Sequence, residues 1–273
     1  MELTEAGRTA WDAIVAQPGT TLLCTDFDGV LSPIVDDPTA AWAAEPAVAA
    51  LGRLAPRLAK VAVVTGRPAR QAVHLGRFDQ RERLGSMSVL GLYGFERWDA
   101  ATGTFTEPDA PSGVAAALAE LPAVLGRLGL ADARVEDKRL SVGIHTRELP
   151  DPTGAFERLR GPLAALAERH GLHPEPGRFV HELRAPGVDK GEAIRGLVDE
   201  VDPRVVVYAG DDLGDIPAFE AVRALRATGR VSALLICSGS DEQDALVQLA
   251  DVVVAGPEGV ARLWEELADA VAG

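Results

Sequence analysis

The sequence is poor in cysteine, with only Cys24 and Cys237 among its 273 residues. Two cysteines exclude the multi-disulfide framework of a small secreted domain. Both lie in apolar runs, so we expect buried free thiols. Aromatic residues are also scarce, at 5% of the sequence. We therefore expect a core that is built mainly from Ala, Val and Leu.

Positive charge is in short supply as well, with 27 Lys and Arg against 41 Asp and Glu. This balance argues against nucleic-acid or anionic-membrane partners, because both need a basic surface. The sequence has no apolar run of about 20 residues that could span a membrane. Its start, MELTEAGRTAWDAI, lacks the basic and apolar segments of a signal peptide. We expect a cytoplasmic protein, and an anionic substrate remains compatible if cations line its pocket.

What the sequence does contain is a series of short apolar runs, each ending at polar residues or glycine. These runs cover residues 21–29, 60–67, 88–94, 204–212, 231–239 and 251–259. Helical patterns cover residues 46–59, 68–78, 189–201, 217–225 and 258–272. Continuous Val, Ile and Leu runs suit strands that are buried on both faces of a sheet. The alternation predicts an α/β fold with a doubly wound, mostly parallel, Rossmann-like sheet.

The middle of the chain breaks this alternation. It reads as helix, strand–turn–strand, helix and strand, over residues 112–130, 133–147, 152–171 and 178–186. We expect Ser112 to be the N-cap of the first helix and Gly171 to end the second. The block predicts a small α+β domain over residues 109–185, inserted into a core domain of residues 1–108 and 186–273.

Acidic residues follow the predicted strands at the edge where open α/β sheets bind ligands. They are Asp26, Asp28, Asp211 and Asp212, with Asp215 one turn further on. Several carboxylates in one crevice repel one another, and a hard divalent cation such as Mg²⁺ removes that repulsion. Thr65 and Lys190 supply donors that suit phosphate oxygens. Together these residues indicate phosphoryl chemistry. Asp215 has an alternative role as the N-cap of the helix that begins near Pro217.

Four of these segments resemble the motifs of phosphatases in the haloacid dehalogenase superfamily. In order, they are DFDGVLSPI, VVTGRP, DKGEAI and GDDLGD. Within the superfamily, the chain is similar to the trehalose-6-phosphate phosphatase family from about residue 20 to residue 260. Further matching segments are GLYGFERW, VEDKRLSVGIHTR and VHELRAPGVDKGEAI. The chain departs from the family pattern at Tyr93, where histidine is common, and at Gly214 and Ile216.

The resemblance implies Mg²⁺-dependent hydrolysis of trehalose 6-phosphate to trehalose and phosphate. It makes Asp26 the nucleophile, which forms an aspartyl-phosphate, and makes Asp28 the residue that exchanges a proton with the leaving sugar and with water. Thr65 and Lys190 would hold the phosphoryl oxygens. A small-molecule sugar phosphate would then be the substrate.

The resemblance also implies a metal site. Asp26, Asp211 and the main-chain carbonyl of Asp28 would contact Mg²⁺. Asp215 and Asp212 would support the site directly, through water or through Lys190.

The inserted domain is the expected cap, which would admit substrate and water in order. The resemblance assigns glucose contacts to Glu136, Lys138 and Glu182. By strand parity, Lys138 belongs in a turn and His145 on the face opposite the apolar residues. All four also have an ordinary reading as surface residues of the sheet. Arg67 either contacts substrate or caps the sheet edge.

Two other functions stay open at this point. The same chemistry could act on another disaccharide phosphate or on a pseudo-disaccharide phosphate, because the cap sets the sugar. A binding or regulatory module could retain the fold without catalysis, although every catalytic position is occupied. A transient contact with a trehalose-phosphate synthase is likewise left open.

Overall fold

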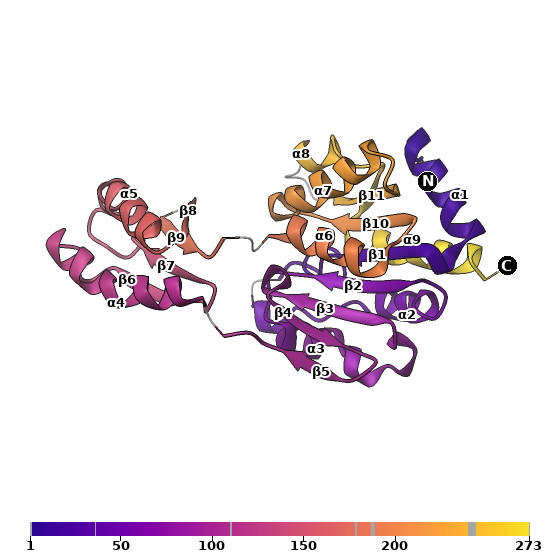
Figure 1. The fold of residues 1–273 in the computed structure, drawn as a ribbon, viewed down its shortest axis with the longest axis horizontal. Coiled ribbons are helices and arrows are strands. Elements are labelled where there is room, and N and C mark those ends of the chain that lie inside the picture. The colour runs from indigo at the N-terminus through magenta and orange to yellow at the C-terminus, as the bar shows by residue number, and fades with distance from the viewer. Residues whose placement is uncertain are drawn as a thin grey trace. The chain divides into compact units, whose positions relative to one another are not determined.

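The computed structural model describes residues 2–35, 37–109, 111–177, 179–186, 189–239 and 244–272. The chain divides into two compact units. The core unit consists of Met1–Glu107 and Asp189–Gly273, and the inserted unit is Pro108–Val188. Figure 1 shows that the core unit combines the indigo and purple N-terminal stretch with the orange and yellow C-terminal stretch.

The core unit contains an eight-stranded sheet in the order β12-β11-β10-β1-β2-β3-β4-β5. Neighbouring strands from β12 to β3 are parallel. These strands are β1 (Thr21–Thr25), β2 (Lys60–Val64), β3 (Met87–Gly91), β10 (Val205–Gly210), β11 (Ser232–Gly239) and β12 (Val252–Ala255). Each lies within a predicted apolar run, except that β3 begins one residue before its run at Met87, so the mostly parallel α/β sheet is confirmed. Cys24 and Cys237 are buried and free, as expected.

An antiparallel hairpin extends one edge of this sheet and was not predicted. It consists of β4 (Glu96–Asp99) and β5 (Thr104–Thr106). Strand β5 has only three residues, and none of them is fully buried. An edge strand of this kind lacks the apolar pattern that reveals a central strand.

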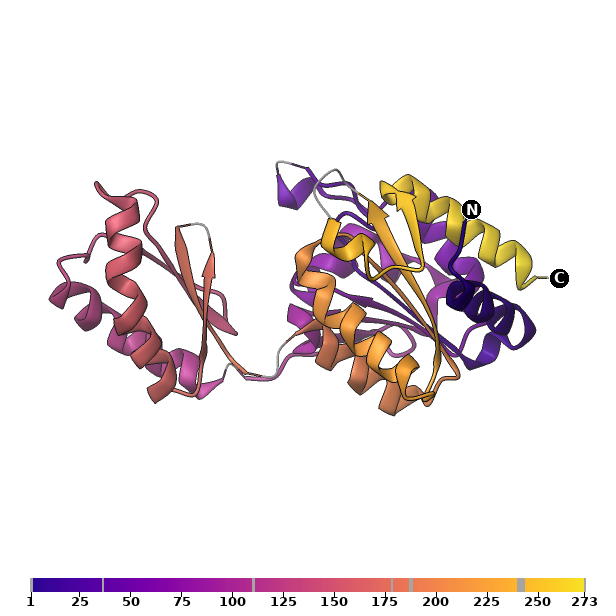
Figure 2. The same cartoon turned by 90° about the horizontal axis from the view of Figure 1, so that it is seen from above.

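Helices cover both faces of the core sheet because side chains alternate between faces along each strand. Leu23 and Val63 belong to the apolar cluster on one face, and Leu22 and Val64 to the cluster on the other. The first face carries α1 (Glu5–Ala16), α2 (Glu45–Leu54), α3 (Ala69–Gly76) and α9 (Gly256–Ala270). The second carries α6 (Lys190–Val201), α7 (Ile216–Ala227) and the short α8 (Asp244–Val247). Figure 2 shows the orange α6 and α7 on the side of the sheet opposite the yellow α9.

Short 3₁₀ helices lie in the connections between the helices and strands of the core unit. They are η1 (Pro18–Thr20), η2 (Pro38–Ala40), η3 (Phe78–Gln80), η4 (Glu82–Leu84), η5 (Leu92–Gly94) and η6 (Leu213–Asp215). In the part of the chain that the structure describes, no helix is both long and apolar enough to cross a membrane.

The inserted unit is an antiparallel sheet with two helices on one face. The strand order is β6-β7-β9-β8. The strands are β6 (Arg134–Asp137), β7 (Ser141–His145), β8 (His173–Gly177) and β9 (Val180–Arg184), and the helices are α4 (Ser112–Arg127) and α5 (Pro152–Arg169). Val142 and Ile144 of β7 are fully buried in the apolar cluster that includes Leu121 and Leu159 of the two helices. Strand β8 was not predicted, because its sequence HPEPG contains two prolines.

Of the two predictions about the ends of the inserted helices, one is wrong and one is confirmed. Ser112 is the first residue of α4, the N-cap is Pro111, and no side chain caps the helix. The prediction that Ser112 is the N-cap was therefore wrong, because its backbone is already helical. Asp151 does cap α5 by accepting a hydrogen bond from the Gly154 N–H. Gly171 follows α5 with φ of 64°, which confirms it as the stop.

Candidate active site

The carboxyl ends of β10, β1 and β2 bring the predicted site residues of the core unit together. These three strands are neighbours and run parallel, so the residues that follow them meet at one edge of the sheet. A pocket of ≈ 440 Å³ lies there. It is lined by Asp26, Asp28, Pro38, Thr65, Gly66, Arg67, Pro68, Gln71, Tyr93, Lys190, Asp212 and Gly214.

Three carboxylates form a buried cluster at this edge. One oxygen from each of Asp26, Asp211 and Asp215 lies within 4.8 Å of the others. Asp26 is 5% exposed, Asp211 is 7% exposed and Asp215 is fully buried. Buried carboxylates are costly unless a cation or hydrogen-bond donors satisfy them. The cluster therefore needs positive charge nearby.

Lys190 supplies part of that charge. Its Nζ lies 2.8 Å from Asp26 Oδ2 and 2.6 Å from Asp215 Oδ1, and the residue is 3% exposed. Lys190 is the first residue of α6, a position where the helix dipole disfavours a cation. Its two carboxylate partners offset that cost, so its contacts with the acidic cluster explain why a lysine occupies this position.

Burial and neighbouring charges shift the pKa values of this cluster. Burial raises the pKa of Asp26 well above its ordinary value, and the nearby Lys190 only partly opposes this. Burial, followed by the charges of Asp215 and Asp212, raises the pKa of Asp211 to about 7. Burial lowers the pKa of Lys190, but Asp26 and Asp215 more than offset this and hold it above its ordinary value. Lys190 thus offsets only part of the cost of burying these carboxylates together.

Asp215 is the most constrained carboxylate of the three. Its Oδ1 accepts hydrogen bonds from Lys190 Nζ and from the Tyr208 hydroxyl, both at 2.6 Å. Its Oδ2 accepts from the backbone N–H of Asp211 at 2.8 Å and of Asp212 at 3.2 Å. The Asp215 side chain does not cap α7, although the residue occupies the N-cap position. It anchors the loop after β10 and orients Lys190.

Sequence reasoning missed Tyr208, which lies in β10 and is fully buried. The available signal was a tyrosine within the apolar run VVVYAG. A buried tyrosine hydroxyl usually needs a hydrogen-bond partner. Its partner here is Asp215, so the hydroxyl belongs to the site.

Asp28 points its carboxylate to Arg67 rather than into the acidic cluster. Arg67 Nε donates to Asp28 Oδ2 and an Arg67 terminal nitrogen donates to Asp28 Oδ1, both at 2.6 Å. A second terminal nitrogen donates to the Pro38 carbonyl at 2.7 Å. Such a bidentate pair fixes both side chains in one orientation. Arg67 lines the pocket together with its partner.

Gly29 allows the loop after β1 to approach Asp211. Its φ is +65°, and a Cβ at this position would lie 1.9 Å from Asp211 Oδ2. The Ser238 hydroxyl holds the Gly29 carbonyl at 2.6 Å. Only glycine fits this approach, which keeps the Asp28–Gly29 backbone beside the acidic cluster.

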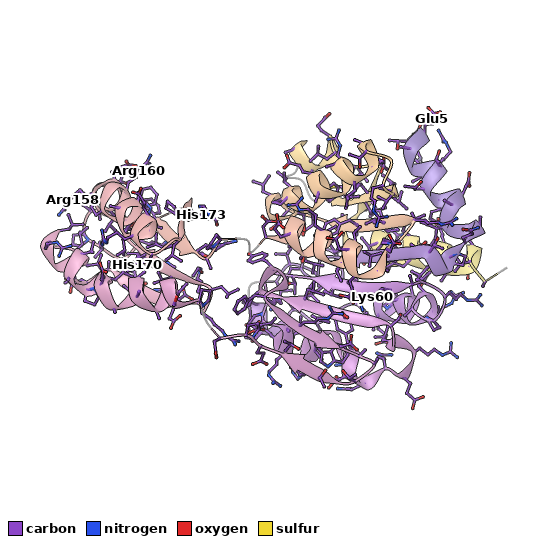
Figure 3. All side chains as sticks on the ribbon, viewed as in Figure 1. Glu5, Lys60, Arg158, Arg160, His170 and His173 are labelled. Carbon is purple, nitrogen blue, oxygen red and sulfur yellow. The ribbon has the colours of Figure 1, made fainter. Side chains whose placement is uncertain are left out.

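The buried cluster fits a hard divalent cation. Its candidate ligand atoms are carboxylate oxygens, the type that Mg²⁺ prefers. The burial cost that Lys190 does not offset would favour a cation there. His170 and His173 are not part of this cluster, because they belong to the inserted unit (Figure 3), where His170 pairs with Glu120. A carboxylate site is thus the candidate metal centre in the part of the chain that the structure describes.

The four predicted sugar contacts lie on one face of the inserted sheet, opposite α4 and α5. Glu136 pairs with His145 at 2.8 Å, and Lys138 Nζ donates to Glu182 at 2.9 Å. The Ser141 hydroxyl also donates to Glu182, at 2.7 Å. Burial raises the pKa of Glu182, but the bonds from Lys138 and Ser141 outweigh this and hold it below its ordinary value. Lys138 follows β6, in the turn where strand parity predicted it.

Comparisons of the sequence with a family model and with curated proteins point to the same family. The family model described as trehalose-phosphatase matches residues 24–252. A trehalose-phosphate phosphatase of Mycobacterium marinum is 38% identical over 207 residues, which cover 72% of this chain and 50% of that protein. The chain spans about half the length of the curated relatives it matches.

Solved structures share the fold. A trehalose-6-phosphate phosphatase of Aspergillus fumigatus matches with a TM-score of 0.75 at 20% identity, covering 98% of this chain and 99% of that one. A haloacid dehalogenase-like hydrolase from Bacteroides thetaiotaomicron matches with a TM-score of 0.58 at 15% identity, covering 90% of this chain and 99% of that one. At these identities the likeness shows the fold alone.

Proposed function

Because this chain belongs to the trehalose-phosphatase family, we propose that it hydrolyses trehalose 6-phosphate to trehalose and phosphate, with Mg²⁺ as its cofactor. The observation that carries the proposal is the buried pairing of Asp26 with Lys190 beside Asp211. The arrangement would provide a nucleophile and a cation for phosphoryl oxygens in one pocket, with an oxygen-rich metal site beside it.

Asp26 is the proposed nucleophile. Lys190 contacts Asp26 Oδ2, which leaves Oδ1 to attack phosphorus. The new Asp26–phosphorus bond forms as the bond from phosphorus to the sugar oxygen breaks. Water then attacks the aspartyl-phosphate, releases phosphate and restores the carboxylate. Thr65 and Lys190 would hold the phosphoryl oxygens during both displacements.

Asp28 is the proposed proton carrier, and Arg67 is its positioning partner. Asp28 would protonate the departing sugar oxygen and later accept a proton from the attacking water. The bidentate contact with Arg67 fixes the direction of the Asp28 carboxylate in this structure. The same arginine lies in the pocket wall and would meet an anionic substrate.

Asp26, Asp211 and the main-chain carbonyl of Asp28 would hold Mg²⁺. When bound, the ion would neutralise the carboxylates and offset the charge of the phosphate. The four hydrogen bonds that Asp215 accepts use the acceptor capacity of both its oxygens. Asp215 is therefore better suited to supporting Lys190 and the Asp211 loop than to direct ligation.

The inserted unit, Pro108–Val188, is the proposed cap, which the sequence suggested over residues 109–185. The paired face of Glu136, Lys138, His145 and Glu182 presents charged acceptors and donors that suit sugar hydroxyls. A cytoplasmic location and a transient contact with a trehalose-phosphate synthase stay predictions.

The test is phosphate release from a panel of sugar phosphates with and without Mg²⁺. We expect trehalose 6-phosphate to be the best substrate and chelation of the metal to abolish turnover. Equal rates on sucrose 6-phosphate would contradict the substrate assignment and favour another disaccharide. No release from any sugar phosphate would favour a binding module.

A further inference from the structure

Tyr93 is the aromatic residue of the pocket wall. The other lining residues, all of which the structure describes, are charged, polar, glycine or proline. Tyr93 is partly buried and shares the wall with Asp26 and Lys190. Among these lining residues, Tyr93 therefore supplies the aromatic ring of the pocket that holds the proposed nucleophile.

The backbone that carries Tyr93 is strained. Leu92 has φ of 47° and Tyr93 has φ of 61°, so two consecutive non-glycine residues adopt the left-handed conformation. Each such residue has a higher free energy than in the right-handed conformation. Surrounding contacts must hold the turn in place for it to persist, and such strain gathers at functional sites.

Two hydrogen bonds tie this turn to the loop after β2. The Tyr93 N–H donates to the Thr65 carbonyl, and the Leu92 N–H donates to the Arg67 carbonyl, both at 2.9 Å. The residues that receive these bonds flank Gly66. These hydrogen bonds thus hold Tyr93 against the loop that is proposed to bind phosphate.

The hydroxyl end of the Tyr93 ring lies against Gly66. A Cβ on Gly66 would lie 2.8 Å from the Tyr93 hydroxyl and 3.0 Å from the ring carbon that bears it. The missing side chain at Gly66 and the ring at Tyr93 are therefore complementary. This contact sets the ring beside Thr65, where the phosphorylated end of the substrate would enter.

We propose that the Tyr93 ring contacts the sugar that carries the phosphate and selects for it. This inference rests on the proposed function and adds a specificity-determining residue on the core side of the site. Aromatic faces pack well against the C–H surface of a sugar ring while its hydroxyls bond elsewhere. Small phosphate esters without a sugar ring gain no binding free energy from this aromatic surface.

The experiment measures kcat and KM for trehalose 6-phosphate and for methyl phosphate, which has an alkoxide leaving group but no sugar ring. The variants are Tyr93→Ala, Tyr93→Leu and Tyr93→Phe. Leucine keeps bulk over Gly66 without an aromatic face, and phenylalanine keeps the ring. Trp42→Ala is the matched control, because Trp42 is 40% exposed and is not among the pocket-lining residues.

We expect Tyr93→Ala and Tyr93→Leu to lower kcat/KM for trehalose 6-phosphate by about tenfold or more, mainly through KM. Their values for methyl phosphate should change less than about twofold, and Tyr93→Phe and Trp42→Ala should resemble the wild type on both esters. Equal losses on both esters, or a loss in Tyr93→Phe as large as in Tyr93→Ala, would overturn the inference.

The two proposals fail in different ways. A wild-type preference for trehalose 6-phosphate that survives in Tyr93→Ala overturns the role of Tyr93 alone. A wild type without any preference overturns the proposed function and this inference with it. Thermal melts identify a variant that is unfolded. If Tyr93→Ala does not fold, Tyr93→Leu decides the question, because leucine keeps more side-chain bulk than alanine and has no aromatic face.

Discussion

The ammonium nitrogen of Lys190 lies 2.8 Å from a carboxylate oxygen of Asp26, and both side chains are almost fully buried. The lysine also contacts Asp215, so a single cation separates two acids. This relationship links the stability of the core unit to its proposed chemistry, because the groups that would react are also groups that must be neutralised.

Replacing Lys190 with methionine should remove activity and reduce stability. The change leaves Asp26 and Asp215 without their buried cation, and breaking such a pair costs about 3 kcal/mol or more. Urea unfolding at neutral pH measures the loss. Asp26→Asn is the matched comparison. It removes a buried charge that burial already disfavours, so it should leave the unfolding free energy unchanged or raise it. A stable Lys190→Met protein would contradict this account of the cluster.

Gly29→Ala should disable the site. Its Cβ would lie 1.9 Å from Asp211 Oδ2, so the loop or the aspartate must move. A displacement of about 1 Å in a catalytic group commonly costs about 10²-fold in rate. Gly103→Ala is the control, since Gly103 has a similar φ of +67° with nothing within 4 Å of the added Cβ. The control should lose about 1 kcal/mol of stability and keep its kcat. Equal kcat values for the two variants would contradict the role of Gly29.

Tyr208→Phe should lower kcat by about tenfold with little change in KM, because one hydrogen bond of about 1.4 kcal/mol to the Asp215 anchor disappears. Phe219→Leu provides the control. The Phe219 ring meets the Tyr208 ring edge-on with centroids 5.6 Å apart, but a phenylalanine side chain has no hydrogen-bond donor for Asp215. The control should lower the melting temperature and leave kcat unchanged. An unaltered kcat in Tyr208→Phe would show that the hydroxyl is only structural.

Glu200 gives a prediction for the pH dependence of stability. Hydrogen bonds from Arg97, with further help from Lys60, lower the pKa of Glu200 from 4.5 to about 2. A carboxyl group whose pKa is lowered by folding stabilises the fold fully when the pH is above its pKa in the unfolded chain. That stabilisation is lost as the pH falls from about 4.5 towards 2. The Glu200 side chain is 42% exposed, so the gain is below about 1 kcal/mol. Figure 3 labels Lys60, which begins β2.

Urea unfolding of the wild type and of Glu200→Gln at pH 7 and pH 3 checks the predicted pH dependence of the stabilisation by Glu200. The difference in unfolding free energy should be present at pH 7 and smaller at pH 3. Arg195 and Glu192, an exposed pair within α6, offer the control, and Glu192→Gln should have a smaller effect at pH 7. A difference for Glu200→Gln that grows at low pH would contradict the assigned sign.

The central fold could be predicted from the sequence because its strands are buried on both faces. Runs such as VVVYAG and ALLIC contain little but apolar residues, and their alternation with helical segments indicates parallel crossovers. The hairpin of β4 and β5 and the edge strand β8 escaped prediction. Each lies at a sheet edge, where exposure removes the apolar pattern and tertiary pairing decides the conformation.

The acidic edge of the site could also be predicted, because parallel strands place their carboxyl ends together. The sequence could not reveal which groups pair across loops. Asp28 and Arg67 are 39 residues apart, and their bidentate contact depends on the packing of two separate loops. The hydroxyl of Tyr208 reaches Asp215 only because η6 turns that side chain back towards the sheet. The positive φ of Tyr93 likewise has no local signal, since tyrosine rarely adopts it.

The most direct measurement is phosphate release from trehalose 6-phosphate by the wild type and by Asp26→Asn, each with Mg²⁺ and with chelator. We expect turnover only in the wild type with Mg²⁺, together with a folded and thermally stable Asp26→Asn protein. Sustained phosphate release by Asp26→Asn in Mg²⁺ would show that this carboxylate does not attack phosphorus.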